Sequence, residues 1–462
     1  MTPRSALLFL FLFLISSIPT IRAQNWGSPV WQDEFNGSAG SAIDSSKWTY
    51  DTGNLQVNNE LEIYCAPSTA IAPCDPANPN AFIDGAGHLV IQHRLNGTTW
   101  TSARVKTKGV KSFQYGRIEA NLQIPSHAGL WPAFWMLGDN IDSVSWPGCG
   151  EVDIMENWPG IGATKNATSM HGTGYSGGNS LTSQFTFPNG ERVDTAFHTY
   201  GVIWSPNMMQ FYIDDPGNIT FVRTAADVPA GSTWPFNNPF FLIANMAVGG
   251  VLGGTPDGGT ASVGPTLFDY IRYYQPPTIA GPTMAASAIT VNAGASGSTT
   301  LNLNSAIGNG LVYLACTNAP AKASCVVDSG NSLNSHVVDF SSNATATATI
   351  KVTTTANSAQ AIPSQHYLAF ASSIGILGLL AMPFSFGMKA GSGHKTRLSL
   401  ALLVSLALAM AFPGCGGGTS NAGGGNNGGG TIGTPTGTTN LTITAYTISG
   451  DTATANVSLT VK

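Results

Sequence analysis

Short runs in which apolar and polar side chains alternate recur along residues 26–275. Examples are HLVIQHRL at 88–95, YGRIEANLQI at 115–124 and MQFYIDD at 209–215. An alternation of period two places successive side chains on opposite faces of a strand, and Gly, Pro and Asn between the runs mark turns. Helix-period patterns are almost absent outside two apolar runs near the C-terminus. We therefore predict an all-β protein, in which residues 24–277 form one large sandwich domain.

The composition changes after QPPTIAGPT at 275–283, where aromatic residues become rare and Ala, Thr, Ser and Val predominate. Alternating segments such as TTLNLNSA and TATATIKVTTT continue the strand pattern. We predict a small immunoglobulin-like β-sandwich whose first part is residues 278–366 and whose last strands lie in residues 440–462. The Gly-rich segment 413–439 has the composition of a flexible linker.

Two apolar runs in residues 367–412 interrupt this small sandwich. Residues 367–388 contain 22 positions without a charge, and residues 398–412 contain 15 more. A bilayer span needs about 20 apolar residues, and the Lys and Arg between the runs are typical of a cytoplasmic loop. We predict a transmembrane hairpin and membrane association. A buried helical hairpin in a soluble domain is the alternative.

Residues 1–23 have the pattern of a secretory signal peptide, with Arg4, a short apolar run and a small residue, Ala23, at the cleavage position. An uncleaved anchor is the alternative, but the run is short for a span. We predict export, with the large domain outside the cytoplasm, at the cell surface or anchored to a membrane.

Cysteine spacing and charge indicate the compartment of the protein and exclude one class of function. Cys65 and Cys74 are nine residues apart, as are Cys316 and Cys325, which predicts two local disulfides in an oxidising compartment. The formal net charge is −5, and Lys and Arg are scattered along the chain. This distribution excludes the basic footprint of a nucleic-acid-binding protein.

The stretch CGEVDIMENW at 149–158 concentrates three acids in a chain in which 9% of residues are charged. On a strand, Glu151 and Asp153 share one face, whereas Glu156 is out of phase. A β-bulge at Ile154 or Met155 would return Glu156 to that face. Two glutamates so placed, with carboxyls about 5–6 Å apart, suit retaining glycoside hydrolysis. A solvated strand face or a calcium site are the alternatives, although the apolar surroundings make idle solvation of the acids costly.

GEVDIMEN resembles the E-x-D-x-x-E signature of glycoside hydrolase family 16, in the form typical of laminarinase-type endo-β-1,3-glucanases. Further segments resemble that family's blocks in the same order: NNELEIY at 58–64, the segment from TSARVKTKG to YGRIEANLQIP at 101–125, GLWPAFWMLG at 129–138, FHTYGVIWSP at 197–206, FFLIANMAVGG at 240–250 and FDYIRYYQ at 268–275. The resemblance covers residues 26–275. It implies a jelly roll of two antiparallel sheets with a sugar cleft on its concave face. It also implies that Glu151 is the nucleophile, Asp153 its helper and Glu156 the acid/base.

Other residues are candidates for binding the sugar. Trp131 and Trp135 fall on one strand face, where two indoles could line a groove and stack on sugar rings; core packing is the alternative. The resemblance places Asn59, Glu60, Arg104 and His171 along the cleft, although His171 is equally well interpreted as a buried histidine with satisfied hydrogen bonds.

The resemblance also implies a structural calcium ion on the convex face, at positions that match Glu34, Gly87 and Asp269. Carboxylate and carbonyl oxygens are the ligands that calcium prefers. No cofactor is expected for catalysis.

Two functions from different classes fit these residues. The first is an exported, endo-acting retaining hydrolase of β-1,3-glucan, because the bulged signature goes mainly with that substrate in the family. Hydrolases of mixed-linkage glucan or agarose and transglycosylases are variants of it. The second is a non-catalytic glucan-binding protein, for which a bulge that aligns two glutamates has no use.

Overall fold

The computed structural model describes residues 24–358 and 432–462. Within them the regular structure is almost all strand, which confirms the prediction of an all-β protein. The helical elements in these residues are single turns. They are α1 (Ile141–Val144), α2 (Gly250–Gly253) and the 3₁₀ turns η1 (Gly177–Asn179), η2 (Pro188–Gly190) and η3 (Thr260–Ser262).

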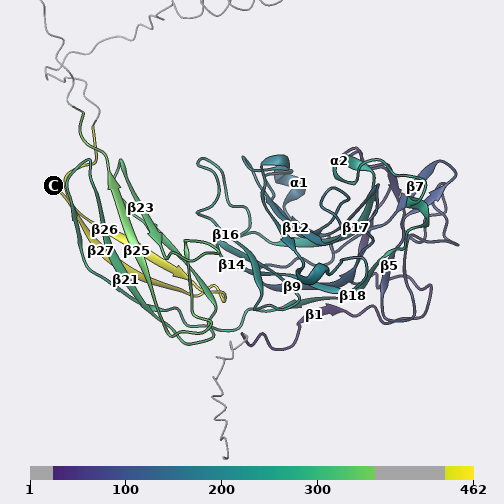
Figure 1. Ribbon diagram of the computed structural model, residues 1–462, viewed down its shortest axis with the longest axis horizontal. Coiled ribbons are helices and arrows are strands. Elements are labelled where there is room, and N and C mark those ends of the chain that lie inside the picture. Colours follow the sequence, from purple (N-terminus) through teal and green to yellow (C-terminus); the bar gives the residue numbers. More distant parts are fainter. Residues whose placement is uncertain (1–23, 359–431) are drawn as a thin grey trace, which may run out of the picture. The chain divides into compact units, whose positions relative to one another are not determined.

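Two large antiparallel sheets form the N-terminal sandwich and lie as two layers in Figure 1. The eight-stranded sheet has the order β16-β15-β14-β9-β18-β5-β4, with β1 also paired to β18, and the seven-stranded sheet has the order β13-β12-β11-β10-β17-β8-β2. The strands of the eight-stranded sheet are β1 (Trp31–Asp33), β4 (Ala81–Ile83), β5 (Leu89–Ile91), β9 (Gly116–Gln123), β14 (His198–Ser205), β15 (Met208–Ile213), β16 (Ile219–Thr224) and β18 (Thr266–Tyr274). Those of the seven-stranded sheet are β2 (Thr49–Asp51), β8 (Arg104–Lys106), β10 (Leu130–Gly138), β11 (Glu151–Glu156), β12 (Lys165–His171), β13 (Leu181–Thr186) and β17 (Phe240–Val248). A third, small sheet contains β3 (Glu62–Tyr64), β7 (Thr99–Ser102) and β6 (Arg94–Asn96).

The core of this sandwich comes from alternate residues of the facing strands. Ile118, Ala120 and Leu122 of β9 and Phe134 and Met136 of β10 belong to one buried cluster. Burying a side chain such as Phe134 stabilises the fold by about 1.5–3 kcal/mol. Because strand side chains alternate, the other face of the seven-stranded sheet is left for the residues between these core positions.

A second sandwich follows in the chain. It contains a four-stranded sheet, β19-β21-β25-β23, and a five-stranded sheet, β20-β27-β26-β22-β24, around its own apolar cluster. The bounds are β19 (Thr283–Ala286), β20 (Ile289–Val291), β21 (Ser296–Asn304), β22 (Leu311–Thr317), β23 (Ala323–Asp328), β24 (Val337–Asp339), β25 (Thr345–Thr354), β26 (Gly437–Tyr446) and β27 (Thr452–Val461).

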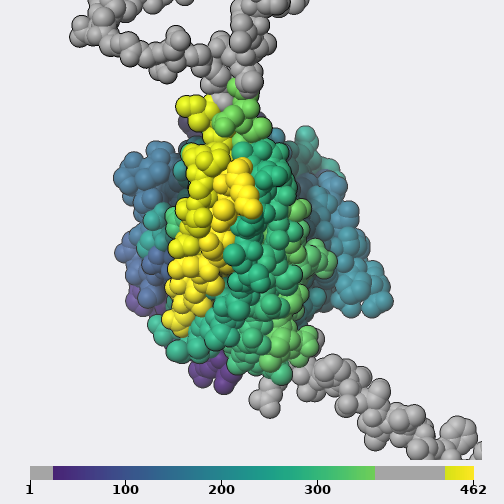
Figure 2. All heavy atoms as spheres, turned by 90° about the vertical axis from the view of Figure 1, so that its left-hand side faces the viewer, coloured from purple at the N-terminus to yellow at the C-terminus, as the bar shows by residue number. Residues whose placement is uncertain are grey.

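The last two strands close this second sandwich. β26 pairs antiparallel with β22, and β27 pairs parallel with β20. Figure 2 shows both strands in yellow, beside green segments that come much earlier in the chain. A disulfide joins Cys316 of β22 to Cys325 of β23 and so links the two sheets. A second disulfide joins Cys65 to Cys74 in the N-terminal sandwich.

Several sequence predictions fall outside the described residues. These are the signal peptide at 1–23, the transmembrane hairpin at 367–412 and most of the linker at 413–439. Among residues 24–358 and 432–462, none of the helices has the length and apolar character needed to cross a membrane.

Candidate active site

The acid cluster lies on β11, in the middle of the seven-stranded sheet, and the strand is bulged there. Its register with β10 and with β12 shifts between Asp153 and Glu156. Ile154 has no partner on β10, and Ile154 and Met155 are both buried in the core although they are adjacent in sequence. The extra residue brings Glu156 to the face of Glu151 and Asp153. This confirms the bulge predicted from the spacing of the acids.

All three carboxyl groups line one cleft on the sheet face opposite the core. The cleft has a cavity volume of about 70 Å³. Its walls come from four strands and the loop before β3, and they consist of Asn58, Glu60, Arg104, Trp131, Ala133, Trp135, Glu151, Asp153, Glu156, Asn245 and Ala247. The three acids therefore share one side of the sheet, as the bulge requires.

Burial dominates the protonation behaviour of these acids. It raises the pKa of Glu151, of Asp153 and of Glu156 to about 8 in each case. The charge of Asp153 adds to the rise at both glutamates, while His171 and Arg104 oppose it at Glu151. Because three neighbouring carboxylates cannot all be charged in a site of low polarity, protons must be retained. His171 opposes the rise at Glu156 as well, so Arg104 is the basic group that acts on Glu151 but not on Glu156.

Hydrogen bonds hold the acids in place. The indole N–H of Trp131 donates to Glu156 Oε1 at 2.9 Å. The His171 Nε2 atom lies 3.1 Å from Asp153 Oδ2 and 3.5 Å from Glu151 Oε1. His171 pairs directly with Glu151 across strands β11 and β12. Each acid thus has a neighbour that restricts its side chain.

Comparison with known proteins decides the family. The model of the glycosyl hydrolases family 16 matches residues 44–262. A beta-glucanase from Rhodothermus marinus is 34% identical over 277 residues, which are 57% of this chain and 90% of that protein. The chain belongs to glycosyl hydrolases family 16. The glucan endo-1,3-beta-glucosidase A1 of Niallia circulans is 29% identical, over 53% of this chain and 37% of that protein. The laminarinase catalytic domain from Thermotoga maritima is 35% identical in sequence over 54% of this chain and 98% of that structure, with a TM-score of 0.48.

The indole N–H groups of the two cleft tryptophans, Trp131 and Trp135, both donate hydrogen bonds. Trp135 donates to Asn245 Oδ1 at 2.8 Å, and the guanidinium of Arg104 lies 4.6 Å from the centre of the Trp135 ring. Arg104 is itself paired with Asp51 at 3.0 Å. Because both indoles are only half-buried and cannot swing freely, they form a stable apolar wall against which a sugar ring can stack.

A hydrogen-bonded chain extends this wall toward β3. Asn245 donates to the Tyr64 hydroxyl at 3.1 Å, and that hydroxyl donates to Glu60 Oε2 at 3.3 Å. The family resemblance implies a cleft position for Glu60 but not for Tyr64 or Asn245. Both lie inside blocks that resemble the family, but nothing in their local pattern distinguishes them from ordinary strand residues.

The loop before β3 places Asn58 at the cleft. Its side chain donates to Glu60 Oε1 at 3.1 Å. Asn59, the residue chosen from sequence, is exposed and is not part of the cleft wall. Both asparagines have positive φ, 51° for Asn58 and 58° for Asn59, so the direction of each side chain depends on a turn that strand periodicity does not describe.

A further buried acid, Glu62, lies behind this chain and was not singled out from the sequence. Its Oε2 accepts a hydrogen bond from the Val248 backbone N–H at 2.7 Å. Burial, followed by the charge of Glu60, raises the pKa of Glu62 to about 8. The side chain is 2% exposed. Glu62 therefore anchors the last residue of β17 through a backbone hydrogen bond.

The residues suggested for calcium fit a metal site only in part. Both carboxylate oxygens of Glu34 accept hydrogen bonds from Arg272, at 2.8 and 2.7 Å. Gly87 lies in a turn with φ of 97°, and Asp269 is at a register shift between β18 and β9. In this arrangement the Glu34 carboxylate is already neutralised by a guanidinium. Calcium stays a prediction, and no catalytic step below depends on it.

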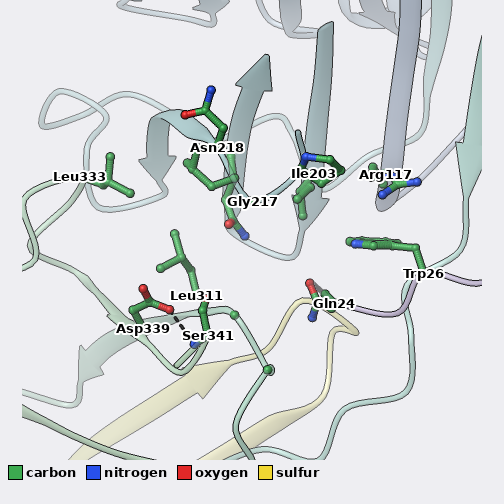
Figure 3. A pocket seen from close by; sticks show the side chains of 15 residues that line it. Gln24, Trp26, Arg117, Ile203, Gly217, Asn218, Leu311, Leu333, Asp339 and Ser341 are labelled. Carbon is green, nitrogen blue, oxygen red and sulfur yellow. Dashed lines mark hydrogen bonds between the residues drawn. The ribbon is translucent and has the colours of Figure 1, made fainter. Parts of the chain in front are cut away.

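A larger cavity, of about 250 Å³, lies elsewhere in the described part of the chain. Figure 3 shows Trp26, Gln24, Asn218 and Arg117 around it, with Asp339 on the opposite side. Asp339 is the one carboxylate among its lining residues, and its Oδ1 accepts the Ser341 backbone N–H at 2.8 Å. Without a second acid, this cavity lacks the pair that glycoside hydrolysis requires.

Proposed function

We propose that this chain is an endo-acting, retaining β-1,3-glucanase. The observation that carries the proposal is the bulge in β11, which brings Glu151 and Glu156 to one face of the sheet with Asp153 between them. The printed functions of the relatives, a beta-glucanase and a glucan endo-1,3-beta-glucosidase, support β-glucan as the substrate class.

In the first step Glu151 attacks the anomeric carbon, and Glu156 gives its proton to the departing glycosidic oxygen. The bond from carbon to that oxygen breaks as the bond to Glu151 forms, which leaves a glycosyl ester on Glu151 and a free hydroxyl on the leaving sugar. The raised pKa of Glu156, about 8, keeps the proton available near neutral pH.

In the second step Glu156, now a carboxylate, takes a proton from water. The water oxygen attacks the same carbon and releases Glu151, so the product keeps the configuration of the substrate. Asp153 is held by His171 between the two glutamates, and its charge helps to keep the proton on Glu156. The indoles of Trp131 and Trp135 would hold the sugar rings against the cleft wall.

The test is product analysis of the purified protein on laminarin, mixed-linkage β-glucan and agarose. We expect new reducing ends from laminarin, with oligosaccharides of several lengths from the start and the β-anomer appearing first in the proton NMR spectrum. The matched control is Glu151→Gln, which keeps the side-chain shape and removes the nucleophile. Binding of laminarin without release of reducing ends, by the wild type, would establish a glucan-binding protein instead.

Export is part of the proposal, and it rests on the signal-like residues 1–23 and the two disulfides. Edman sequencing of the mature protein should start near Gln24. Fractionation of expressing cells tests the membrane association predicted from residues 367–412. Full recovery in the soluble fraction would contradict that association without affecting the proposed activity.

A further inference from the structure

His171 has a hydrogen-bond partner at each ring nitrogen. Nε2 faces Asp153 Oδ2 at 3.1 Å and Glu151 Oε1 at 3.5 Å. On the other side of the ring, Nδ1 lies 3.1 Å from the backbone nitrogen of Gly177. The His171 side chain is 12% exposed, whereas Gly177 lies at the exposed surface.

The backbone N–H of Gly177 decides which ring nitrogen carries the proton. A backbone N–H can only donate, so Nδ1 must accept and carries no proton. The ring proton is then on Nε2, directed at the carboxyl groups of Asp153 and Glu151. A second proton on Nδ1 would point at the Gly177 N–H and remove that hydrogen bond.

We propose that the Gly177 amide holds His171 as the neutral Nε2–H tautomer, and that His171 is a positioning residue which donates to Asp153 and lies against Glu151. It is thus neither a sugar ligand nor a permanent positive charge. The inference rests on the proposed function for its kinetic consequences, but the tautomer itself is a property of the folded protein.

The conformation of the loop at residues 172–177 fixes the position of the Gly177 amide. Gly177 has φ of 55°, a conformation that side chains disfavour, and starts the turn η1. The loop is closed where Gly172 and Tyr175 exchange backbone hydrogen bonds. Tyr175 is fully buried and its hydroxyl donates to the Thr233 carbonyl at 2.8 Å. A Cβ on Gly172 would lie 2.5 Å from the Tyr175 ring, so only glycine permits this closure.

An indole and an uncharged strand border the other sides of the His171 ring. The indole of Trp146 lies 6.2 Å away, centre to centre, and the adjoining strand β13, LTSQFT, carries no charged residue. The titratable groups that contact the ring in the described residues are Glu151 and Asp153 of β11. A neutral donor aligns these acids while leaving their negative charge uncancelled, and that charge is what keeps the proton on Glu156. An imidazolium at the same place would weaken this effect.

Two substitutions separate positioning from the other roles. His171→Gln keeps an N–H donor near the Nε2 position and can never be charged, whereas His171→Ala removes the donor. We expect His171→Gln to retain kcat within about tenfold with an unchanged pH profile, and His171→Ala to lose about 100-fold in kcat with little change in KM. The matched control is His88→Gln, at a histidine that does not line the cleft.

Other outcomes would overturn the proposal. A rise in KM for both variants at constant kcat would identify a sugar-binding histidine. If the Gln variant lost as much as the Ala variant, together with one limb of the pH profile, His171 would act as a charged group. Circular dichroism must show all variants folded.

A measurement without substrate tests the tautomer directly. In the ¹H–¹⁵N spectrum of protein labelled at histidine nitrogen, assigned by comparison with His171→Gln, His171 should show one protonated nitrogen, Nε2, and one unprotonated nitrogen at pH 7. Two protonated nitrogens, or a proton on Nδ1, would refute the proposal even if the enzyme proved active. Failure of the glucanase activity alone would leave this result untouched.

Discussion

The indole N–H of Trp131 donates a hydrogen bond to Oε1 of Glu156 at a distance of 2.9 Å. One side chain therefore both lines the sugar cleft and contacts the proposed proton donor. Burial and the charge of Asp153 raise the pKa of Glu156, and this hydrogen bond opposes part of that rise. Trp131 thus limits how tightly Glu156 holds its proton.

Replacing Trp131 with Phe should move the basic limb of the kcat/KM profile to higher pH. The hydrogen bond that lowers the Glu156 pKa is lost while most of the aromatic surface remains, so the shift should be about 0.5–1 pH unit. The matched control is Trp135→Phe, whose indole N–H bonds to Asn245 and not to an acid. That variant should raise KM and leave the basic limb in place. An unmoved limb in Trp131→Phe would show that Glu156 does not set it.

Azide can distinguish the nucleophile from the acid/base among the two glutamates. Glu156→Ala should cleave a glucoside with a dinitrophenyl leaving group, which needs no proton, and azide should speed the second step and yield a β-glycosyl azide. Glu151→Ala should instead yield the α-azide, because azide then replaces the nucleophile. Both variants should lose about 1,000-fold or more on laminarin without azide. NMR of the azide products decides, and the same anomer from both variants would contradict the assignment.

The buried acid cluster should make the protein less stable as pH rises. The pKa of Glu156 is raised to about 8 in the folded chain, whereas an unfolded glutamate titrates near its ordinary value of about 4.3. Between these values the folded chain holds a proton that the unfolded chain has released, so the free energy of unfolding falls with increasing pH. Glu156→Gln should then be more stable than the wild type by roughly 2 kcal/mol at pH 8.

The same variant at pH 4 provides the control. There the folded and unfolded chains both retain the proton, so the advantage of Glu156→Gln should nearly vanish. Thermal unfolding followed by circular dichroism at the two pH values measures the difference. An advantage of equal size at pH 4 and pH 8 would mean that the substitution acts through packing and not through the proton.

Removing the Cys316–Cys325 disulfide should destabilise the second sandwich. The bond closes a loop of nine residues in sequence separation, for which the loss of chain entropy corresponds to about 2–3 kcal/mol. A Cys316→Ala, Cys325→Ala double variant should lower the unfolding transition of that domain and leave laminarin hydrolysis unchanged. Cys65→Ala with Cys74→Ala provides the comparison in the catalytic domain. Equal unfolding temperatures of the second sandwich with and without the Cys316–Cys325 disulfide would contradict the expectation.

Local patterns predicted much of the fold. Alternation identified β9 and β15, in which every second residue, such as Ile118 and Phe211, belongs to the main buried cluster. The acid spacing predicted the bulge, because only an extra residue reconciles Glu151 and Glu156 with a period of two. The compositional change after residue 275 coincides with the end of β18 and the start of a separate core. Each of these features depends on neighbours in sequence.

Features that depend on a turn or on distant segments were not predictable. Asn58 rather than Asn59 lines the cleft, since consecutive left-handed residues direct the two side chains differently. The Glu34 carboxylate contacts Arg272, 238 residues later in the chain. Neither the turn nor this contact leaves a periodic trace in the sequence.

By itself, the sequence determined that this protein is built of strands and that three acids share one face of a bulged strand, because the period of a strand is a local property of the backbone. Tertiary structure alone decided what those acids contact. Trp131 reaches Glu156 from 25 residues away, and the Gly177 amide orients His171 only because a loop closes over it. Such contacts depend on how sheets and loops pack, and the protonation of a buried carboxyl group depends on those contacts and not on its neighbours in sequence.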